Sequence, residues 1–161
     1  MQHITFTDEG FIFPNEKINV DLATLKTIFV DNFPNSTTRK TLYDNYLRYI
    51  DDFSKQITPH FTQWVNGSFV TLKENPNDID FVTFIKRAEY QKIEADIDKY
   101  WSFSLEKQGL DAYIVQIYEE HTEKYVSRTL KHTNDWSQRY SNTKPDDNLE
   151  TFKKGFLEII F

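Results

Sequence analysis

Apolar residues recur along the chain with two different periods, which predict helices and strands in turn. The clearest helical pattern starts after Ser36, a typical N-cap residue, and Thr58-Pro59 ends it because proline cannot continue a helix. A shorter pattern predicts a helix over Leu22–Val30, capped by Asp21 and followed by the break Asn32-Phe33-Pro34-Asn35. The apolar stripe of the longer helix consists of Leu42, Tyr46, Tyr49, Ile50, Phe53 and Ile57.

Runs rich in β-branched and aromatic residues predict four strands, at Phe61–Val65, Ile79–Ile85, Asp111–Tyr118 and Gly155–Phe161. Two further helices are expected over Ala88–Lys107, which Gly109 ends, and over Glu119–Tyr140. Met1–Pro14 is expected to be an irregular or strand-like lead-in, and Ser141–Asn148 a polar loop. Because helices and strands alternate, the predicted fold class is α/β (α+β), a mixed β-sheet flanked by helices.

The 161 residues fit one domain, with no repeat and no long linker. We expect residues 1–57 to form a helical N-terminal lead-in, residues 61–118 the sheet core and residues 119–161 a C-terminal helix and strand. The chain has no cysteine, which excludes disulfides, Cys-zinc sites and Cys nucleophiles. The N-terminus lacks a signal-peptide pattern and no apolar run could span a membrane, so the expected location is cytoplasmic. A net charge of −6 argues against generic nucleic-acid binding.

The stretch Trp64–Ile85 contains the candidate chemistry: a strand ends in Gly67-Ser68, and Asp78-Ile79-Asp80 opens the next strand. Residues i and i+2 of a strand point to the same face, so the two carboxylates are expected to project together. Paired like charges are costly unless a cation such as magnesium neutralises them. Gly67 allows a phosphate to approach the backbone closely, and the Ser68 hydroxyl and nearby N–H groups can hold its oxygens.

This order resembles the nucleotidyltransferase superfamily with the DNA-polymerase-beta-like fold, whose hallmark is hydrophobic-Gly-Ser, a spacer of about ten residues and Asp-hydrophobic-Asp. The resemblance implies that Asp78 and Asp80 bind Mg²⁺, and that Asp111 is a third carboxylate, which ligates one metal and activates the acceptor. The segment Asn32–Arg39 (NFPNSTTR) and the C-terminal Lys153–Ile159 (KKGFLEI) look like a small, poorly characterised bacterial branch of that superfamily. The residue after Ser68 is Phe69, whereas antitoxin-type members usually have an arginine soon after Gly-Ser.

Residues outside this motif contribute less to the prediction of function. Lys73 is a candidate contact for the triphosphate, although an isolated lysine in a polar loop is usually just exposed. A second Asp-Ile-Asp, Asp96–Asp98, falls in a predicted helix, where residues i and i+2 do not share a face. No histidine-ligand spacing, P-loop or serine-hydrolase elbow is present. Cations that could meet a phosphate elsewhere, but that the sequence does not rank, are Arg39, Lys40, Arg139, Lys153 and Lys154.

Two functions remain open. The first is a magnesium-dependent nucleotidyltransferase that moves a nucleoside monophosphate from a nucleoside triphosphate to the hydroxyl of an unknown acceptor, protein or RNA among them. The second is a catalytically silent module of the same fold that binds a protein partner of the toxin–antitoxin or defence type. The first requires a metal-dependent nucleotide site at Asp78, Asp80 and Asp111, whereas the second does not.

Overall fold

The computed structural model describes residues 4–101, 105–145 and 149–161. Its elements form an α+β fold with one five-stranded mixed sheet and one two-stranded hairpin. The strands are β1 (Thr5–Phe6), β2 (Ile12–Phe13), β3 (Lys17–Asn19), β4 (Thr62–Asn66), β5 (Ile79–Lys86), β6 (Leu110–Ile117) and β7 (Phe156–Ile160). The α-helices are α1 (Leu22–Lys26), α2 (Arg39–Gln56), α3 (Arg87–Ile93) and α5 (Lys131–Tyr140). The predicted mixed sheet flanked by helices is confirmed.

The strand order of the large sheet is β3-β7-β4-β5-β6. β4 lies antiparallel to both of its neighbours, whereas β5 and β6 run parallel. In this register Asn66 pairs with Asp80, and Asp80 pairs with Asp111. Three polar residues from three adjacent strands therefore lie in one row across the sheet.

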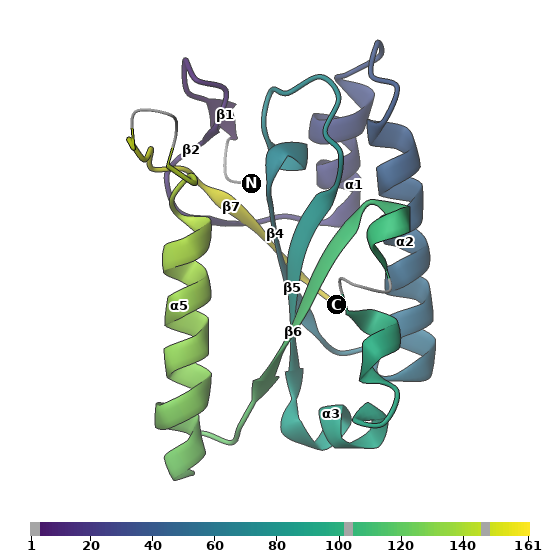
Figure 1. The fold of residues 1–161 in the computed structure, drawn as a ribbon, viewed down its shortest axis with the longest axis vertical. Helices are drawn as coiled ribbons and strands as arrows, with labels where there is room; N and C mark the ends of the chain where they lie inside the picture. The colour runs from purple at the N-terminus through teal and green to yellow at the C-terminus, as the bar shows by residue number, and fades with distance from the viewer. Residues whose placement is uncertain (1–3, 102–104, 146–148) are drawn as a thin grey trace.

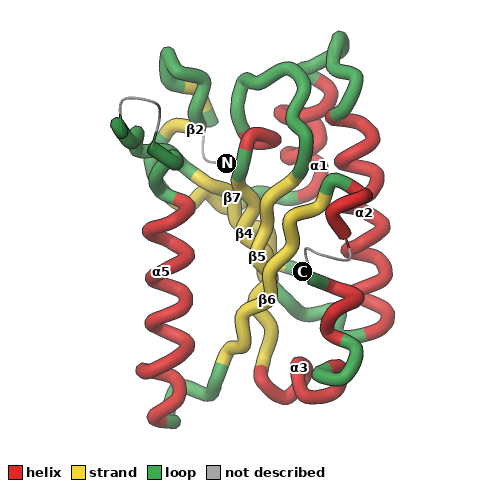
Figure 2. Tube along the Cα trace, in the orientation of Figure 1, coloured by secondary structure: helices red, strands yellow, loops and turns green. Residues whose placement is uncertain are grey.

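Helices cover both faces of the sheet, with α1, α2 and α3 on one side and α5 on the other (Figures 1 and 2). The predicted stripe of α2 is buried, and its aromatic rings pack on the sheet: Tyr46 and Tyr49 lie 5.1 and 4.9 Å from the ring of Phe81. The opposite face has a smaller core around Trp64, Val82 and Tyr140, members of a second buried cluster. Asp80 alternates with Phe81 along β5 and shares its face with Val82, which places it on the α5 side.

The expected helix over Ala88–Lys107 is wrong beyond Ile93, where α3 ends. A turn follows, in which the Asp96 amide donates to the Ile93 carbonyl, and then the 3₁₀ helix η3 (Ile97–Tyr100). Aspartate is a weak helix former, and the turn lets the Tyr100 ring meet Phe53 at 5.5 Å. Residues 102–104 of that expected helix lie outside the described residues, as do residues 1–3 of the lead-in and 146–148 of the polar loop.

Other boundaries shift by a few residues. The helix predicted over Leu22–Val30 begins as α1 and continues as a π-helical segment, η1 (Thr27–Asp31). The helix predicted over Glu119–Tyr140 contains a second π-helical segment, η5 (Tyr125–Leu130), which precedes α5. The short strand β3 was not expected at all, because three residues give too little pattern. In the part of the chain that the structure describes, no helix is both long and apolar enough to cross a membrane.

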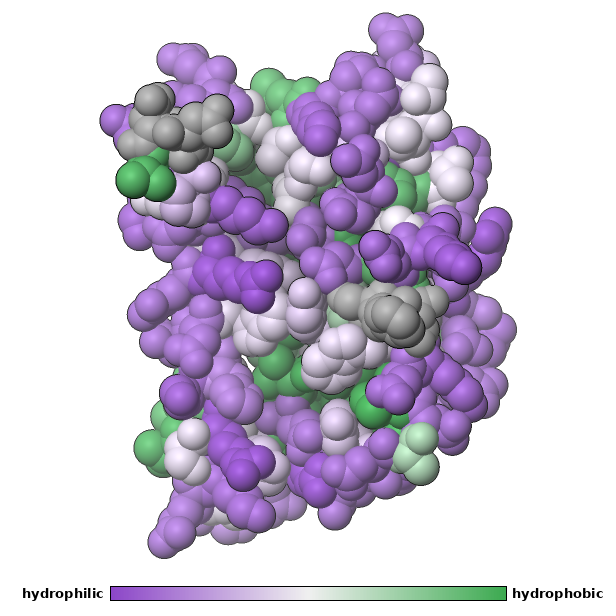
Figure 3. Space-filling model, in the orientation of Figure 1, coloured by the Kyte–Doolittle hydropathy of each residue, from purple (hydrophilic) through white to green (hydrophobic). Residues whose placement is uncertain are grey.

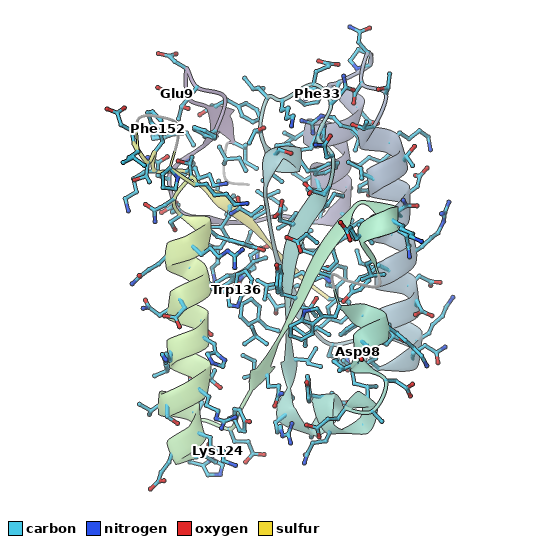
Figure 4. The ribbon with its side chains drawn as sticks, viewed as in Figure 1. Glu9, Phe33, Asp98, Lys124, Trp136 and Phe152 are labelled. Carbon is cyan, nitrogen blue, oxygen red and sulfur yellow. The ribbon has the colours of Figure 1, made fainter. Side chains whose placement is uncertain are left out.

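Hydrophilic residues cover most of the face seen in Figure 3, and less hydrophilic ones gather along its middle. Figure 4 shows Trp136 pointing from α5 toward the sheet in the same region. The Trp136 ring lies 4.9 Å from that of Tyr113 on β6. Packing of α5 thus covers part of the sheet face on which Asp80 lies.

Candidate functional site

Asp80 and Asp111 lie side by side on adjacent parallel strands, and Asp78 precedes β5 by one residue. Burial raises the pKa of Asp80 to about 6, with further contributions from the negative charges of Asp78 and Asp111 and from a hydrogen bond to Asp111. Lys144 opposes this effect. The three predicted carboxyl groups are therefore close enough to act on one another, and Asp80 stands at the centre of the group.

Gly67 lies directly against Asp80. Its φ of 77° is in the left-handed region, which favours glycine. A β-carbon at this position would lie 2.6 Å from Asp80 Cγ and closer still to Oδ2. The turn after β4 therefore brings the backbone onto the carboxyl group, which only a residue without a side chain permits.

Ser68 begins the 3₁₀ helix η2 (Ser68–Val70) immediately after Gly67. The Thr71 hydroxyl donates to the Ser68 carbonyl over 2.8 Å and closes this turn. Phe69 and Val70 are buried, so the turn is anchored on its apolar side while Ser68 stays partly exposed. Lys73 lies farther along the same loop, and its side chain is exposed.

Arg39, the first residue of α2, stabilises the loop between Gly67 and Asp78 through hydrogen bonds. It is 1% exposed, and its guanidinium donates to the carbonyls of Phe69 (2.6 Å), Thr71 (2.8 Å) and Lys73 (2.5 Å). Two further hydrogen bonds go to the carbonyls of Glu74 (3.3 Å) and Phe29 (2.8 Å). Burial lowers the pKa of Arg39 to about 10. Backbone carbonyls, each a partial negative charge, satisfy this buried cation.

The residues just before Arg39 hold the loop near Asn75. The side-chain oxygen of Asn75 accepts hydrogen bonds from the Thr37 amide (2.8 Å), the Ser36 hydroxyl (3.1 Å) and the Thr37 hydroxyl (3.2 Å). Ser36 Oγ in turn accepts a hydrogen bond from the amide of Arg39, the first residue of α2. Ser36, the predicted N-cap residue, therefore caps the helix from three residues before its start. This segment therefore positions the loop between Gly67 and Asp78.

These residues surround a cleft of about 810 Å³. All six residues of the predicted catalytic, metal and nucleotide site line it: Gly67, Ser68, Lys73, Asp78, Asp80 and Asp111. Of the five cations that the sequence left unranked as phosphate contacts, Lys154 lines the cleft and the other four do not. The sequence did not place the β1–β2 hairpin here, and it did not name Lys144. The hairpin residues and those from beyond α5 that complete the lining are Asp8, Glu9, Gly10, Phe11, Thr143, Lys144 and Lys154. Figure 4 shows Glu9 in the hairpin with Phe152 near it, at the upper left of the view, and Phe33 at the upper right.

The donor set fits a hard divalent cation. Among the described residues no three His, Cys, Asp or Glu side chains form a ready-made metal site. Asp80 and Asp111 nevertheless share a hydrogen bond that a cation would replace, and carboxylate oxygens are the ligands Mg²⁺ prefers. Asn66 Oδ1 is buried and has no hydrogen-bond partner in the described part of the chain, and Asn66 pairs with Asp80 in the sheet. An oxygen left without a partner beside two carboxyl groups is consistent with a bound cation or its water.

Tyr140 is buried near the site, at the end of α5. It is 4% exposed, and burial together with the charge of Asp80 raises the pKa of its hydroxyl well above the usual value. The Asn66 amide donates to the Tyr140 carbonyl over 3.2 Å, which joins β4 to the end of α5. The phenol therefore stays neutral.

Comparisons with known proteins identify a family for this chain. No curated protein and no solved structure matches it. A family model matches residues 4–160, nearly the whole chain, and its description is a family of unknown function. The match spans the strands, the loop and the lysines that build the cleft, and the chain therefore belongs to the DUF6932 family.

Proposed function

We propose that this protein is a magnesium-dependent nucleotidyltransferase that moves a nucleoside monophosphate from a nucleoside triphosphate to an acceptor hydroxyl. The observation that carries the proposal is the contact of Gly67 with Asp80 beside Asp111, within a cleft that is open to solvent. That geometry supports a phosphate held at a glycine turn next to paired carboxylates, as phosphoryl transfer requires. The resemblance in sequence order supports the same interpretation.

Five of the cleft residues have a role in the proposed reaction. Asp78 and Asp80 would hold Mg²⁺, which supplies charge neutralisation at the phosphates when bound. The Gly67 backbone and the Ser68 hydroxyl would hold phosphate oxygens. Asp111 would accept the proton of the acceptor hydroxyl as its oxygen bonds to the α-phosphorus. The bond from that phosphorus to the bridging oxygen breaks, and pyrophosphate leaves with the electron pair.

The test is thermal unfolding against a panel of nucleoside triphosphates, with and without Mg²⁺. A ligand at about 100 times its dissociation constant adds roughly 2.7 kcal/mol to the free energy of unfolding. We expect a magnesium-dependent stabilisation of the wild type that Asp78→Asn/Asp80→Asn abolishes.

The chain provides a matched control in its second Asp-Ile-Asp. Asp96 and Asp98 are exposed and lie outside the cleft. Asp96→Asn/Asp98→Asn changes the same two residue types at the same spacing and should leave the magnesium-dependent shift intact. Equal shifts in wild type and the Asp78/Asp80 variant would refute the site. Co-purification of one protein partner regardless of Mg²⁺ and of the Asp substitutions would favour the silent module instead.

A further inference from the structure

Three lysines line the cleft, and they differ in how they are held. Lys73 and Lys144 are exposed, whereas Lys154 is 9% exposed, although it too lines the cleft. Lysine is rarely buried to this extent without a paired negative charge. Among the described residues no ion pair joins Lys154 to a carboxylate.

The backbone around Lys154 is fixed on both sides. Its amide donates to the Ser141 carbonyl over 3.0 Å, and the amide of Gly155 donates to the Ile12 carbonyl over 2.9 Å. A β-carbon at Gly155 would overlap the Pro14 carbonyl oxygen and lie 2.9 Å from Ile12 Cγ2. The chain is thus packed tightly against the lead-in at the point where Lys154 enters the cleft. A side chain on so fixed a backbone loses little freedom when it binds a ligand.

Lys144 is brought to the same place by a short antiparallel contact. Asn142 pairs with Lys153, and the Thr143 amide donates to the Phe152 carbonyl over 2.9 Å. The charges of Lys144 and Lys154 act on each other and on Asp80. Burial and the neighbouring Lys144 lower the pKa of Lys154, while Asp80 works against them. Two ammonium groups near one another and only partly balanced by Asp80 favour an anion with several charged oxygens.

We propose that Lys154 and Lys144 bind the phosphate groups of the substrate that lie beyond the reacting phosphorus, which makes the ligand of this cleft a polyphosphate. The inference rests on the proposed function, because that function places the reacting phosphate at the carboxylates of Asp78, Asp80 and Asp111. Five carboxylates line the cleft, those of Asp8, Glu9, Asp78, Asp80 and Asp111, and without opposing positive charge they would repel such a ligand. The two lysines supply positive charge near Asp80 and would stabilise the pyrophosphate that leaves.

The test uses inorganic pyrophosphate with Mg²⁺, so that it does not depend on which base the protein prefers. Binding is measured by calorimetry for the wild type, Lys154→Met and Lys144→Gln. A hydrogen bond to a charged group corresponds to a loss of about tenfold or more in affinity when it is removed. We expect that loss for Lys154→Met and a smaller one for Lys144→Gln, whose side chain is exposed.

Lys153 provides the matched control, because it is the neighbouring lysine, is exposed and does not line the cleft. Lys153→Met should bind pyrophosphate within about twofold of the wild type. Lys154→Arg keeps the charge and should retain most of the affinity. If Lys154→Met does not fold, the other two variants still test the site. Lys144→Gln should weaken pyrophosphate binding, and Lys154→Arg should retain most of the affinity.

A second series separates this inference from the proposed function. Nucleoside triphosphates and monophosphates are compared on the same variants, and Lys154→Met should weaken the triphosphates selectively. Equal loss for mono- and triphosphates, or no loss for pyrophosphate, overturns the assignment of Lys154 and leaves the transferase proposal standing. If Lys154→Met acts as expected while Asp78→Asn/Asp80→Asn leaves magnesium-dependent binding unchanged, the transferase proposal fails and the polyphosphate site remains. A wild type that binds neither pyrophosphate nor any triphosphate overturns both.

Discussion

Gly67 faces the carboxyl group of Asp80 with no room for a side chain between them. We therefore expect Gly67→Ala to destabilise the protein for two reasons, the left-handed φ and the overlap with Asp80, at a cost of about 1–3 kcal/mol or more. A double-mutant cycle separates them: in the background of Asp80→Ala the overlap with the carboxyl group is gone, and the φ cost remains together with a close contact of 3.1 Å to the β-carbon of residue 80. Chemical denaturation of the four proteins measures the coupling. Additive effects would show that the two residues do not touch.

Asp80→Asn should stabilise the metal-free protein at neutral pH. The pKa of Asp80 is about 6 in the folded protein, above its ordinary 3.8, so the folded state binds the proton more tightly than the unfolded state. Stability therefore falls as the pH rises from about 4 through 6. The substitution removes that fall and should add about 1–2 kcal/mol at pH 7.5, but little at pH 4.

Urea denaturation at both pH values, in a chelator, measures this difference. Asp98→Asn is the control, since Asp98 is exposed and does not line the cleft. Figure 4 shows it at the lower right of the view, whereas Glu9, which lines the cleft, lies at the upper left. The explanation is wrong if Asp80→Asn has the same effect at the two pH values.

Arg39→Met should destabilise the protein by about 3–5 kcal/mol, because it leaves the carbonyls of Phe69, Thr71 and Lys73 without their donor. The loop should also become a substrate for trypsin at Lys73, whose carbonyl Arg39 holds in the wild type. Limited proteolysis followed by mass spectrometry locates the cut. Lys40→Ala, which removes an exposed ion pair with Asp44, should cost less than about 0.5 kcal/mol and leave Lys73 protected.

Two buried tyrosines should respond oppositely to the loss of their hydroxyl groups. Tyr140 Oη has no hydrogen-bond partner among the described residues, so Tyr140→Phe should be neutral or stabilising by up to about 1 kcal/mol. Tyr46 Oη donates to Gln63 Oε1 over 2.7 Å in the core, so Tyr46→Phe should cost about 1–2 kcal/mol. Thermal unfolding of both variants compares them directly. A large loss for Tyr140→Phe would reveal an additional partner at the carboxylate site.

Strand periodicity alone predicts that two of the acidic residues lie together. Their spacing predicts that Asp78 and Asp80 project together, and both line the cleft although Asp78 lies just ahead of β5. Asp111 lies beside Asp80 because β5 and β6 are parallel and in register. Nothing local predicted the role of Arg39: a single arginine at the start of a helix has the pattern of a surface cation, and its five acceptors are distant in sequence. Lys154 could not be told from Lys153, because alternation distinguishes two faces without saying which one lines a cleft.

The prediction of one continuous helix over Ala88–Lys107 is wrong because a contact distant in sequence decides the structure there. Ile93, Ile97 and Tyr100 have helical spacing, but α3 ends at Ile93 and a tighter turn carries Tyr100 onto α2. Packing of an aromatic ring on Phe53 overrode a pattern that was only weakly helical around Asp96 and Asp98. Such competition between local preference and tertiary contact is not visible in one sequence.

The support of the loop by Arg39 also limits how the chain can be divided. Gly67 and the three aspartates lie within one continuous stretch, and a fragment beginning at β4 would contain all of them. It would lack Arg39 and residues 36–38, whose hydrogen bonds hold the loop carbonyls and Asn75. A fragment ending after β6 would lose Lys154 as well. Grafting this stretch into another sheet would therefore transfer its residues but not their arrangement, and the functional unit extends across most of the chain.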